Sequence, residues 1–418
     1  MLKSQRLAII IVAAFHSVPV VGLEINRESF GLHLHGLKYG VRWPSCSFGA
    51  IRLWDSGTQW RQIQPAPSKW DFSALDAYLE QAESQGVIPV LTLGQTPEWA
   101  ASDPSAASPY ARGASSPPAD LALWRDYVRK VAERYDGRIL HWEVWNEVSA
   151  ENFWTGSNSE MVDLERAARS VLKSVNQNNL VLSPSFQAAA FDKFDEYLSE
   201  GGGRYSDIIS YHFYALQYPP EEIVDRIDRV NGILKKHGLA NKPLWNTEMG
   251  WLLANRDGGF GTSLKPSWEK WRRISFSDSP GVVLQALLLS FSGGIDHVFW
   301  YSWNAQQMGL AENRGADPKP AAQAYQAAFD WLVGTQMESC EENAARWVCR
   351  VNAGDKLRYI VWATTPEQFT VPADWKVNTL TSYIGESRSI ASDGGLLIDA
   401  QPVLLSEGAV ATRSCMHP

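Results

Sequence analysis

The chain has 418 residues, of which 45% are apolar and 20% are charged, and its formal net charge is −8. This length exceeds one ordinary compact domain, although an α/β barrel alone takes about 250 residues. The acidic balance argues against a nucleic-acid-binding protein, since such proteins carry basic stripes, and gives no reason to expect binding to an anionic membrane.

The first 22 residues have the layout of a secretory signal peptide. Lys3 and Arg6 precede an apolar run over 7–15, and Val20 and Gly22 suit a cleavage site. The apolar run is too short to span a bilayer, so a retained N-terminal anchor is the weaker alternative. We therefore predict an exported protein, periplasmic or extracellular, that makes no membrane contact after cleavage of residues 1–22.

Short apolar segments alternate with longer amphipathic segments from residue 29 to residue 332. The short segments have the composition of strands, at 29–35, 50–55, 87–94, 139–147, 179–185, 207–214, 242–250 and 295–303. The longer segments have helical apolar spacing, at 73–85, 121–135, 160–176, 190–199, 220–237 and 320–332. Doubly wound sheets also alternate strands and helices, but eight regular units favour a closed (β/α)8 TIM barrel, an α/β fold, over residues 23–335.

Residues 336–418 have a different character. Their apolar runs are of β type, are separated by Gly, Asp, Asn and Pro, and show no helical period. This pattern predicts a small C-terminal antiparallel β-sandwich packed on the barrel. The segment 23–29 is expected to add a strand to it.

The four cysteines are compatible with export, because an oxidising compartment permits disulfides. Cys340 and Cys349 are close in sequence and flank a turn-like segment, so they are the favoured pair. A bond between Cys46 and Cys415 follows only by elimination. Both pairs can equally be free thiols.

Two long loops follow predicted strands at the end where barrel enzymes keep their sites. They cover residues 95–119, rich in Ser, Ala and Pro, and residues 251–277. Long loops inside compact domains are usually functional, so we expect both to wall the site. The GGFG segment with Lys265 is not a phosphate-binding loop, because the order strand, GxxxxGK[ST], helix is absent.

Two glutamates end strands on opposite sides of the predicted barrel mouth, Glu147 on the fourth strand and Glu248 on the seventh. A facing pair of carboxyl groups is what glycoside hydrolysis needs, one protonated to assist the leaving oxygen and one ionised to attack. A lone strand-end glutamate is more often a surface or ion-paired residue. The matching position of the second glutamate favours catalysis.

The neighbours predicted for the two carboxyl groups differ. Arg52 and Tyr214 are candidate partners of Glu248, and hydrogen bonds to the ionised form lower a carboxyl pKa. Glu147 lies among tryptophans, an apolar setting that raises the pKa. Glu143 is expected to point into the barrel and to form an internal ion pair, with Arg52 as its partner, because buried charges need partners.

The HLH segment at 33–35 raises an alternative, since His-x-His on a first strand begins the metal site of one class of barrel hydrolases. Of the further ligands that such a site requires, only His212 is in place. We therefore expect no metal and no cofactor. His35 is expected instead to hydrogen-bond a sugar hydroxyl or a carboxylate. Trp99, Trp300 and Trp303 either stack on the substrate or belong to the core.

The sequence resembles clan A of the retaining glycoside hydrolases. The resemblance lies in WNE at 145–147, the glutamate of NTEMGW, Arg52 and the His-x-Tyr of SYHFY, and within the clan EVWNE and the C-terminal β-domain are similar to glycoside hydrolase family 39. It implies net retention of configuration, with Glu147 as general acid/base and Glu248 as nucleophile. It further implies that Asn146 holds the substrate 2-hydroxyl, that Arg52 and Tyr214 position Glu248, and that His212 lines the same subsite.

The resemblance also bears on the substrate, a polysaccharide or an oligosaccharide. The C-terminal domain is short beside that of the family's β-xylosidases, and RLWDSGTQWRQIQP is similar to members that cleave bacterial exopolysaccharides. An exopolysaccharide is therefore favoured over xylo-oligosaccharides. The alternatives are a β-xylosidase, another clan A enzyme such as an endoglucanase or mannanase, and a non-catalytic carbohydrate-binding barrel, which the presence of both carboxylates disfavours.

Overall fold

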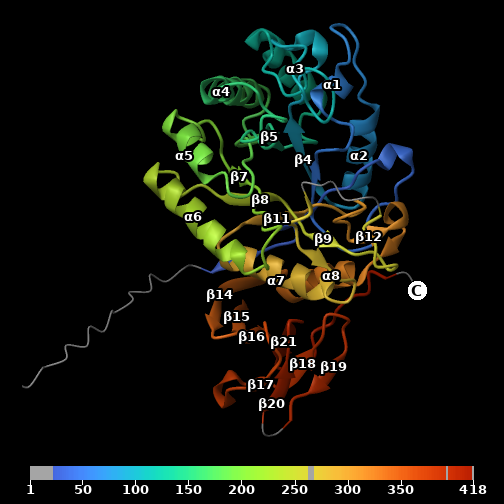
Figure 1. Cartoon of the computed structure of the whole chain (residues 1–418), viewed down its shortest axis with the longest axis vertical. Coiled ribbons are helices and arrows are strands. Elements are labelled where there is room, and N and C mark those ends of the chain that lie inside the picture. Colours follow the sequence, from blue (N-terminus) through green and yellow to red (C-terminus); the bar gives the residue numbers. More distant parts are fainter. Residues whose placement is uncertain (1–21, 262–267, 392–393, 417–418) are drawn as a thin grey trace, which may run out of the picture.

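The computed structural model describes residues 22–261, 268–391 and 394–416. The proposed signal peptide and Lys265 therefore lie outside the described residues, apart from Gly22. A barrel of strands and helices forms the larger part of the molecule, and the C-terminal strands lie beyond helices α7 and α8 (Figure 1).

An eight-stranded parallel sheet forms the barrel, in the order β6-β5-β4-β3-β2-β11-β8-β7. Parallel bridges from Leu182 to Ile208 and from Gln187 to His212 join the two outer strands and complete the ring. The predicted (β/α)8 barrel and its eight strands are thus confirmed. The strands are β2 (Phe30–Leu32), β3 (Ala50–Leu53), β4 (Ile88–Leu93), β5 (His141–Val144), β6 (Leu180–Leu182), β7 (Ile209–Tyr211), β8 (Leu244–Met249) and β11 (His297–Trp300).

All six predicted helices are present. They are α2 (Ser73–Ser84), α3 (Leu121–Arg134), α4 (Asn158–Val175), α5 (Phe191–Ser199), α6 (Glu222–Lys236) and α8 (Pro320–Leu332). Helices α1 (Trp60–Ile63) and α7 (Ser279–Ser292) were not predicted, and short 3-10 helices occur at Leu37–Tyr39, Glu98–Ala100, Asn313–Gly315 and Ala373–Trp375. Within the described part of the chain, no helix is both long enough and apolar enough to cross a membrane.

Helix α7 escaped prediction because almost every residue in it is buried. It packs against α8 and against the first long strand of the C-terminal domain, β14 (Thr335–Asn343). A helix that is apolar all round has no polar face, so its sequence carries no amphipathic period.

The C-terminal region is an antiparallel β structure, as predicted. One sheet has the order β1-β14-β15-β16-β21-β18-β19, and β17 and β20 form a separate pair that packs on it through Tyr359, Phe369 and Leu396. Strand β1 (Leu23–Ile25) pairs with β14, which confirms that the N-terminal segment adds a strand. The others are β15 (Arg346–Ala353), β16 (Lys356–Ala363), β17 (Glu367–Thr370), β18 (Thr379–Thr381), β19 (Ser387–Ser389), β20 (Gly395–Ile398) and β21 (Val403–Ser406).

Two further short strand pairs lie in loops of the barrel domain. They are β9 (Leu252–Leu253) with β10 (Arg273–Ile274), and β12 (Ala311–Glu312) with β13 (Asp317–Pro318). The first pair ties the two ends of the long loop after β8 to each other.

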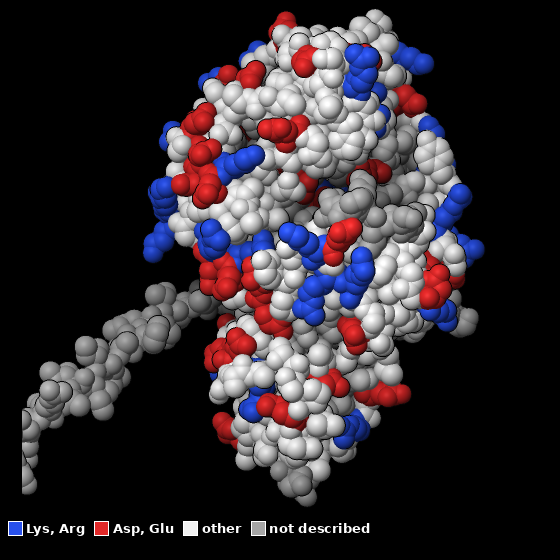
Figure 2. All heavy atoms as spheres, in the orientation of Figure 1, with Lys and Arg blue, Asp and Glu red and all other residues white. Residues whose placement is uncertain are grey.

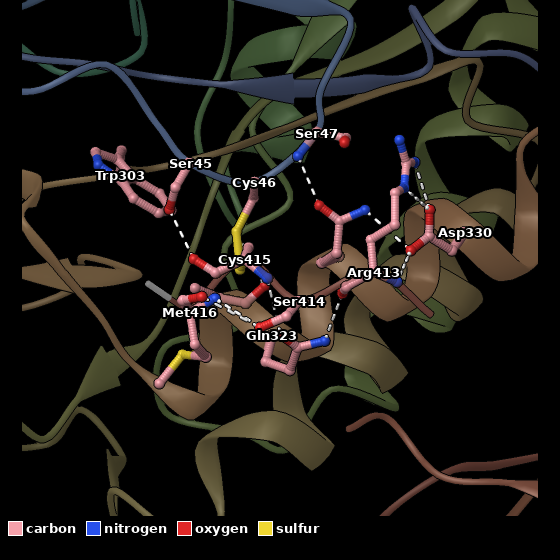
Figure 3. Close-up of a disulfide and its surroundings, with 12 residues drawn as sticks. Ser45, Cys46, Ser47, Trp303, Gln323, Asp330, Arg413, Ser414, Cys415 and Met416 are labelled. Atoms are coloured by element: carbon pink, nitrogen blue, oxygen red, sulfur yellow. Dashed lines mark hydrogen bonds and ion pairs between the residues drawn. A yellow bond between two sulfur atoms is a disulfide. The ribbon is translucent and has the colours of Figure 1, made fainter. Parts of the chain in front are cut away.

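Both predicted disulfides are formed. Cys340 and Cys349 lie directly opposite each other on β14 and β15. Cys46, in the segment before β3, is bonded to Cys415 in the C-terminal tail (Figure 3). Hydrogen bonds also hold the tail at this place. Ser45 Oγ donates to the carbonyl of Cys415 (2.8 Å), and Gln323 Oε1 accepts from the backbone N–H of Cys415 (3.1 Å).

Removing the long-range disulfide is expected to be the more damaging of the two cysteine deletions. Cys46 and Cys415 are 369 residues apart, against 9 for the other pair. Loop-closure entropy predicts a loss of about 6 kcal/mol for the Cys46→Ala/Cys415→Ala variant and about 2.5 kcal/mol for Cys340→Ala/Cys349→Ala. Urea unfolding followed by circular dichroism measures both values. Equal losses in the two variants would contradict the entropic account.

Candidate active site

A cavity of about 560 Å³ opens at the carboxyl ends of the barrel strands. Both long loops wall it, as predicted, with Tyr110 from the loop after β4 and Trp268 and Trp271 from the loop after β8. Every barrel strand, or the loop that follows it, contributes to the lining, and the representatives in chain order are His35, Asp55, Tyr110, Asn146, Gln187, Tyr214, Glu248 and Tyr301.

The two predicted glutamates meet in this cavity. One carboxylate oxygen of Glu147, one of Glu248 and a ring nitrogen of His212 all lie within 4.8 Å of one another. Both glutamate side chains are largely buried, with 7% and 8% of their residue surfaces exposed. The exposed remainder faces the cavity that they line, so a ligand there reaches both carboxyl groups.

Irregular backbone after β5 aims Glu147 into the cavity. The strand ends at Val144, and Trp145 and Glu147 then adopt the left-handed region, with φ of 83° and 47°. Residues that are not glycine are uncommon there and persist only where their surroundings hold them. Here Ser185 Oγ accepts the backbone N–H of Glu147 (2.9 Å), and its carbonyl accepts that of Val148 (3.0 Å).

Two donors hold the carboxylate of Glu248, and both were predicted. Arg52 Nη1 donates to Oε2 (3.0 Å) and the Tyr214 hydroxyl donates to Oε1 (2.7 Å). The same guanidinium donates from Nη2 to Oδ1 of Asn146 (2.8 Å). Arg52 therefore fixes both the carboxylate at the end of β8 and the amide beside Glu147.

Glu143 forms the predicted internal ion pair beneath the cavity. Its carboxylate accepts from Arg52 Nε (2.7 Å), and both side chains are fully buried. The hydroxyls of Thr92 (2.6 Å), Ser210 (2.6 Å) and Thr247 (3.0 Å) donate to the same carboxylate. A buried charge is tolerated when it is paired and hydrogen-bonded in this way.

His212 lies beside both glutamates and contacts Glu147 directly. Its Nδ1 lies 3.0 Å from Oε1 of Glu147. Burial lowers the pKa of His212 to about 4, so the imidazole is neutral at neutral pH and the contact is a hydrogen bond between an uncharged ring and the carboxyl group.

The predicted contrast between the two carboxyl pKa values is corrected. Burial raises the pKa of Glu147 to about 7, which is the predicted direction of the shift. Burial also raises the pKa of Glu248 to about 7, because it outweighs the donors Arg52 and Tyr214, which lower it. The pair therefore titrates together near neutrality. Since only Glu248 contacts a cation, we assign the first ionisation of the pair to Glu248.

A bell-shaped pH profile is expected for kcat/KM, centred near neutrality. Below the first ionisation of the pair Glu248 is protonated and loses its negative charge, and above the second Glu147 has no proton to donate. Both pKa values are near 7, so the bell is narrow and its maximum is low. Initial rates between pH 4 and pH 10 test this expectation, and a plateau over several pH units would contradict it.

Three of the four remaining predicted substrate residues lie away from the cavity. Trp300 and Trp303 are fully buried in the core, and their indole N–H groups donate to the carbonyls of Met308 and Gly315. Trp99 donates to the carbonyl of Gln64 and packs on Trp60. None of the three belongs to the described lining, so stacking on the substrate is corrected to a packing role.

His35 does line the cavity. Asn304 holds its backbone on both sides, because its Oδ1 accepts the N–H of His35 and its Nδ2 donates to the carbonyl. The ring packs against Tyr301, with 4.9 Å between the ring centroids.

In the part of the chain that the structure describes, the histidines of the first strand do not form the alternative metal site. Among the described residues, the group able to hold a cation is Glu147, His212 and Glu248, without His33 or His35. His33 instead directs Nε2 at the carbonyl of Thr247 (3.0 Å).

Several lining residues were given no role from the sequence, including Asp55, Tyr301, Trp268 and Trp271. Asp55 carried a signal, since it directly follows a strand at the correct face. Tyr301 is next to Trp300, and adjacent residues point to opposite sides of a strand, so a shift of one position separates a core residue from a cavity residue.

Comparison with known proteins agrees with this site. The model of the glycosyl hydrolases family 39 matches residues 45–257, more than half of the chain. Among solved structures, a family 39 glycoside hydrolase from the gut symbiont Bacteroides cellulosilyticus WH2 superposes with a TM-score of 0.69 at 18% identity, covering 91% of this chain and 81% of that one.

Two other structures have the same architecture. A monomeric β-xylosidase from Caulobacter crescentus CB15 has a TM-score of 0.64 at 15% identity, with 92% of this chain and 97% of that chain covered. A family 30 endoxylanase from Clostridium papyrosolvens C71 has a TM-score of 0.60 at 12% identity, with 94% and 98% covered. At such identities these likenesses concern the fold.

Proposed function

Because this chain belongs to glycosyl hydrolase family 39 and is a glycosidase, we propose that it cleaves its substrate with retention of configuration, by double displacement between Glu248 and Glu147. The observation that carries the proposal is the approach of the two carboxyl groups to within 4.8 Å, oxygen to oxygen. Retaining enzymes hold the pair about 5–5.5 Å apart, whereas inverting enzymes leave about 6.5–9.5 Å for a water molecule.

In the first step an oxygen of Glu248 attacks the anomeric carbon while the bond from that carbon to the leaving oxygen breaks. Glu147 gives its proton to the leaving oxygen. Arg52 and Tyr214 hold Glu248 in place for this attack and favour its ionised form against the effect of burial. His212 orients the carboxyl group of Glu147.

In the second step Glu147, now ionised, takes a proton from water. The water oxygen attacks the same carbon and Glu248 leaves as a carboxylate, so two inversions give net retention. Asn146 has its amide oxygen occupied by Arg52, which leaves the NH2 group to donate to the sugar 2-hydroxyl.

The proposed substrate is a polysaccharide or oligosaccharide, with a bacterial exopolysaccharide favoured over xylo-oligosaccharides. The support is the resemblance of RLWDSGTQWRQIQP to exopolysaccharide-cleaving members and the short C-terminal domain. The β-xylosidase among the structural neighbours supports the second candidate. The N-terminal segment and the two disulfides support action outside the cytoplasm.

The test follows the first product by NMR during hydrolysis of a panel of aryl glycosides. The released sugar should have the anomeric configuration of the substrate, and a 2-deoxy-2-fluoro glycoside should label Glu248 covalently. Release of the opposite anomer would contradict double displacement. If the panel is not cleaved, a bacterial exopolysaccharide and xylan are assayed for new reducing ends, and release from neither would contradict the proposed activity.

A further inference from the structure

The charge of the cavity is one-sided. The described lining residues include three acidic side chains, Asp55, Glu147 and Glu248, and neither a lysine nor an arginine. On the face of the molecule drawn in Figure 2, by contrast, lysine, arginine and acidic side chains intermingle. Two arginines of the described chain lie near the cavity but already have partners, since Arg52 is buried beneath Glu248 and Arg61 Nε donates to Gln95 (2.6 Å).

Asp55 is the carboxylate that double displacement does not use. It follows β3 in the left-handed region, with φ of 57°. Its Oδ2 accepts the hydroxyl of Tyr301 (2.8 Å). The hydroxyl of Tyr110 accepts a hydrogen bond from the indole N–H of Trp54 (3.0 Å) and forms another with Asp55. Burial and the neighbouring Asp55 carboxylate raise the pKa of Tyr110.

This arrangement holds Asp55 in place and leaves part of it unsatisfied. A carboxylate accepts about four hydrogen bonds, and two phenol donors occupy two of them. The carboxylate is only partly buried and lines the cavity, so a ligand can supply the remaining donors.

His35 lies in the same corner of the cavity as Asp55 and Tyr301, and its ring can form a further hydrogen bond. Its Nε2 is buried and has no hydrogen-bond partner. Burial lowers the pKa of His35, so the ring is neutral near pH 7 and can exchange hydrogen bonds with a hydroxyl. His35, Tyr301 and Asp55 together present neutral and anionic acceptors and donors of the kind that suit sugar hydroxyls.

The corner lies near the nucleophile Glu248. Tyr110 and Tyr301 lie close to both Asp55 and Glu248, because the charges of these two carboxyl groups contribute to the raised pKa of each tyrosine. The nucleophile attacks the anomeric carbon of the glycone, so groups next to Glu248 contact that sugar.

We propose that the cavity binds an uncharged glycone and that Asp55 is the residue that selects it. The position of the glycone next to Glu248 rests on the proposed function. Asp55 accepts hydrogen bonds from two hydroxyls of the sugar. It repels a hexuronic acid, whose carboxylate would enter a site that already holds three acidic groups and whose described lining offers it no cation.

The experiment compares neutral sugars with uronic acids of the same stereochemistry. Saturation-transfer NMR measures binding of methyl glucoside, galactoside and mannoside against the corresponding methyl uronides, and 4-nitrophenyl hexosides and hexuronides measure turnover. The proteins are wild type, Asp55→Asn, Asp55→Glu and Asp126→Asn, a control that removes one negative charge from the exposed face of α3.

Wild type and Asp126→Asn should prefer hexosides by about 100-fold or more, because a buried unpaired charge is rejected strongly. Asp55→Asn should weaken hexoside binding and lower kcat/KM for hexosides by about 10-fold to 100-fold. It should also reduce the ratio of hexoside use to hexuronide use at least tenfold. Asp55→Glu keeps the charge and should keep the preference, which separates charge from packing.

The two readouts separate the possible failures. Equal use of hexuronides by wild type, or an unchanged ratio in Asp55→Asn, overturns the selection by Asp55 and leaves double displacement standing. A preference for hexosides in binding without any turnover supports the selection and contradicts the proposed activity. Neither binding nor turnover of any sugar overturns both.

Discussion

Glu248→Ala is expected to lose on the order of 10⁵-fold to 10⁶-fold in turnover of aryl glycosides, because the variant has no carboxylate to form the covalent intermediate. Azide can enter the space left by the side chain and attack the anomeric carbon directly. A single displacement gives a glycosyl azide of inverted configuration. Its stereochemistry, read by NMR, identifies the residue replaced as the nucleophile.

Glu147→Ala is expected to behave differently with the same substrates. A nitrophenolate leaves without acid assistance, so the first step persists in single-turnover measurements. The second step lacks a general base, and steady-state turnover falls by about 10²-fold to 10⁴-fold. Azide needs no base, attacks the glycosyl-enzyme and gives a retained glycosyl azide.

The control is Glu151→Ala, an exposed glutamate four residues after Glu147, which should keep activity within about twofold because surface substitutions have small effects. Retained azide from Glu248→Ala and inverted azide from Glu147→Ala would reverse the two roles. Full activity in either variant would remove that glutamate from the mechanism.

The strands of the barrel were predictable because each is a short apolar run between turn-forming residues. The six amphipathic helices were predictable because each has a polar face. Helix α7 was not, since its environment is apolar on every side and only the packing of the two domains reveals it. Helix α1, with one turn, is too short to show a period.

The centre of the site was predictable from topology alone. Once the strand order is known, Glu147, Glu248, Arg52 and Tyr214 must meet at one end of the barrel. What strand order cannot give is the direction of a side chain beyond the strand end. Asp55 enters the cavity through a left-handed backbone, and Tyr301 lines it while Trp300, one position earlier, is buried.

The pKa of Glu248 was mispredicted for a related reason. The sequence identified its two donors correctly, but the sign of the shift depends on how far burial outweighs them. Depth of burial is a property of the assembled cavity, because residues from eight strands and their loops enclose the carboxyl group. A list of partners does not contain that information.

Arg52 links the catalytic carboxylate to the interior of the barrel, so Arg52→Met is expected to damage stability and activity together. The side chain is fully buried and contacts Glu143, Asn146 and Glu248. Removing one partner of a buried ion pair costs about 3–5 kcal/mol. The pKa of Glu248 should rise further without the guanidinium, so the nucleophile is protonated at neutral pH and kcat/KM falls by about 10²-fold to 10⁴-fold.

The pH dependence of the two losses has a definite sign. The folded pKa of Glu248, about 7 in the wild type, is already above its unfolded value near 4.5, and the variant raises it further. Folding then favours the protonated carboxyl group, so the stability of the variant falls as pH rises from about 4.5 through the folded pKa. Activity should recover partly at higher pH, which appears as an alkaline shift of the acid limb of kcat/KM.

A second substitution separates the structural role of Arg52 from its effect on Glu248. Glu143→Gln neutralises the carboxylate that Arg52→Met leaves without its cation, while Thr92, Ser210 and Thr247 still contact the side chain. The Arg52→Met/Glu143→Gln variant should therefore regain about 2 kcal/mol of stability, a coupling expected for residues in contact. Its kcat/KM and the position of the acid limb should remain those of Arg52→Met, because the carboxylate of Glu248 still lacks the Arg52 guanidinium. Recovery of activity together with stability would instead mean that Arg52 supports only the barrel interior.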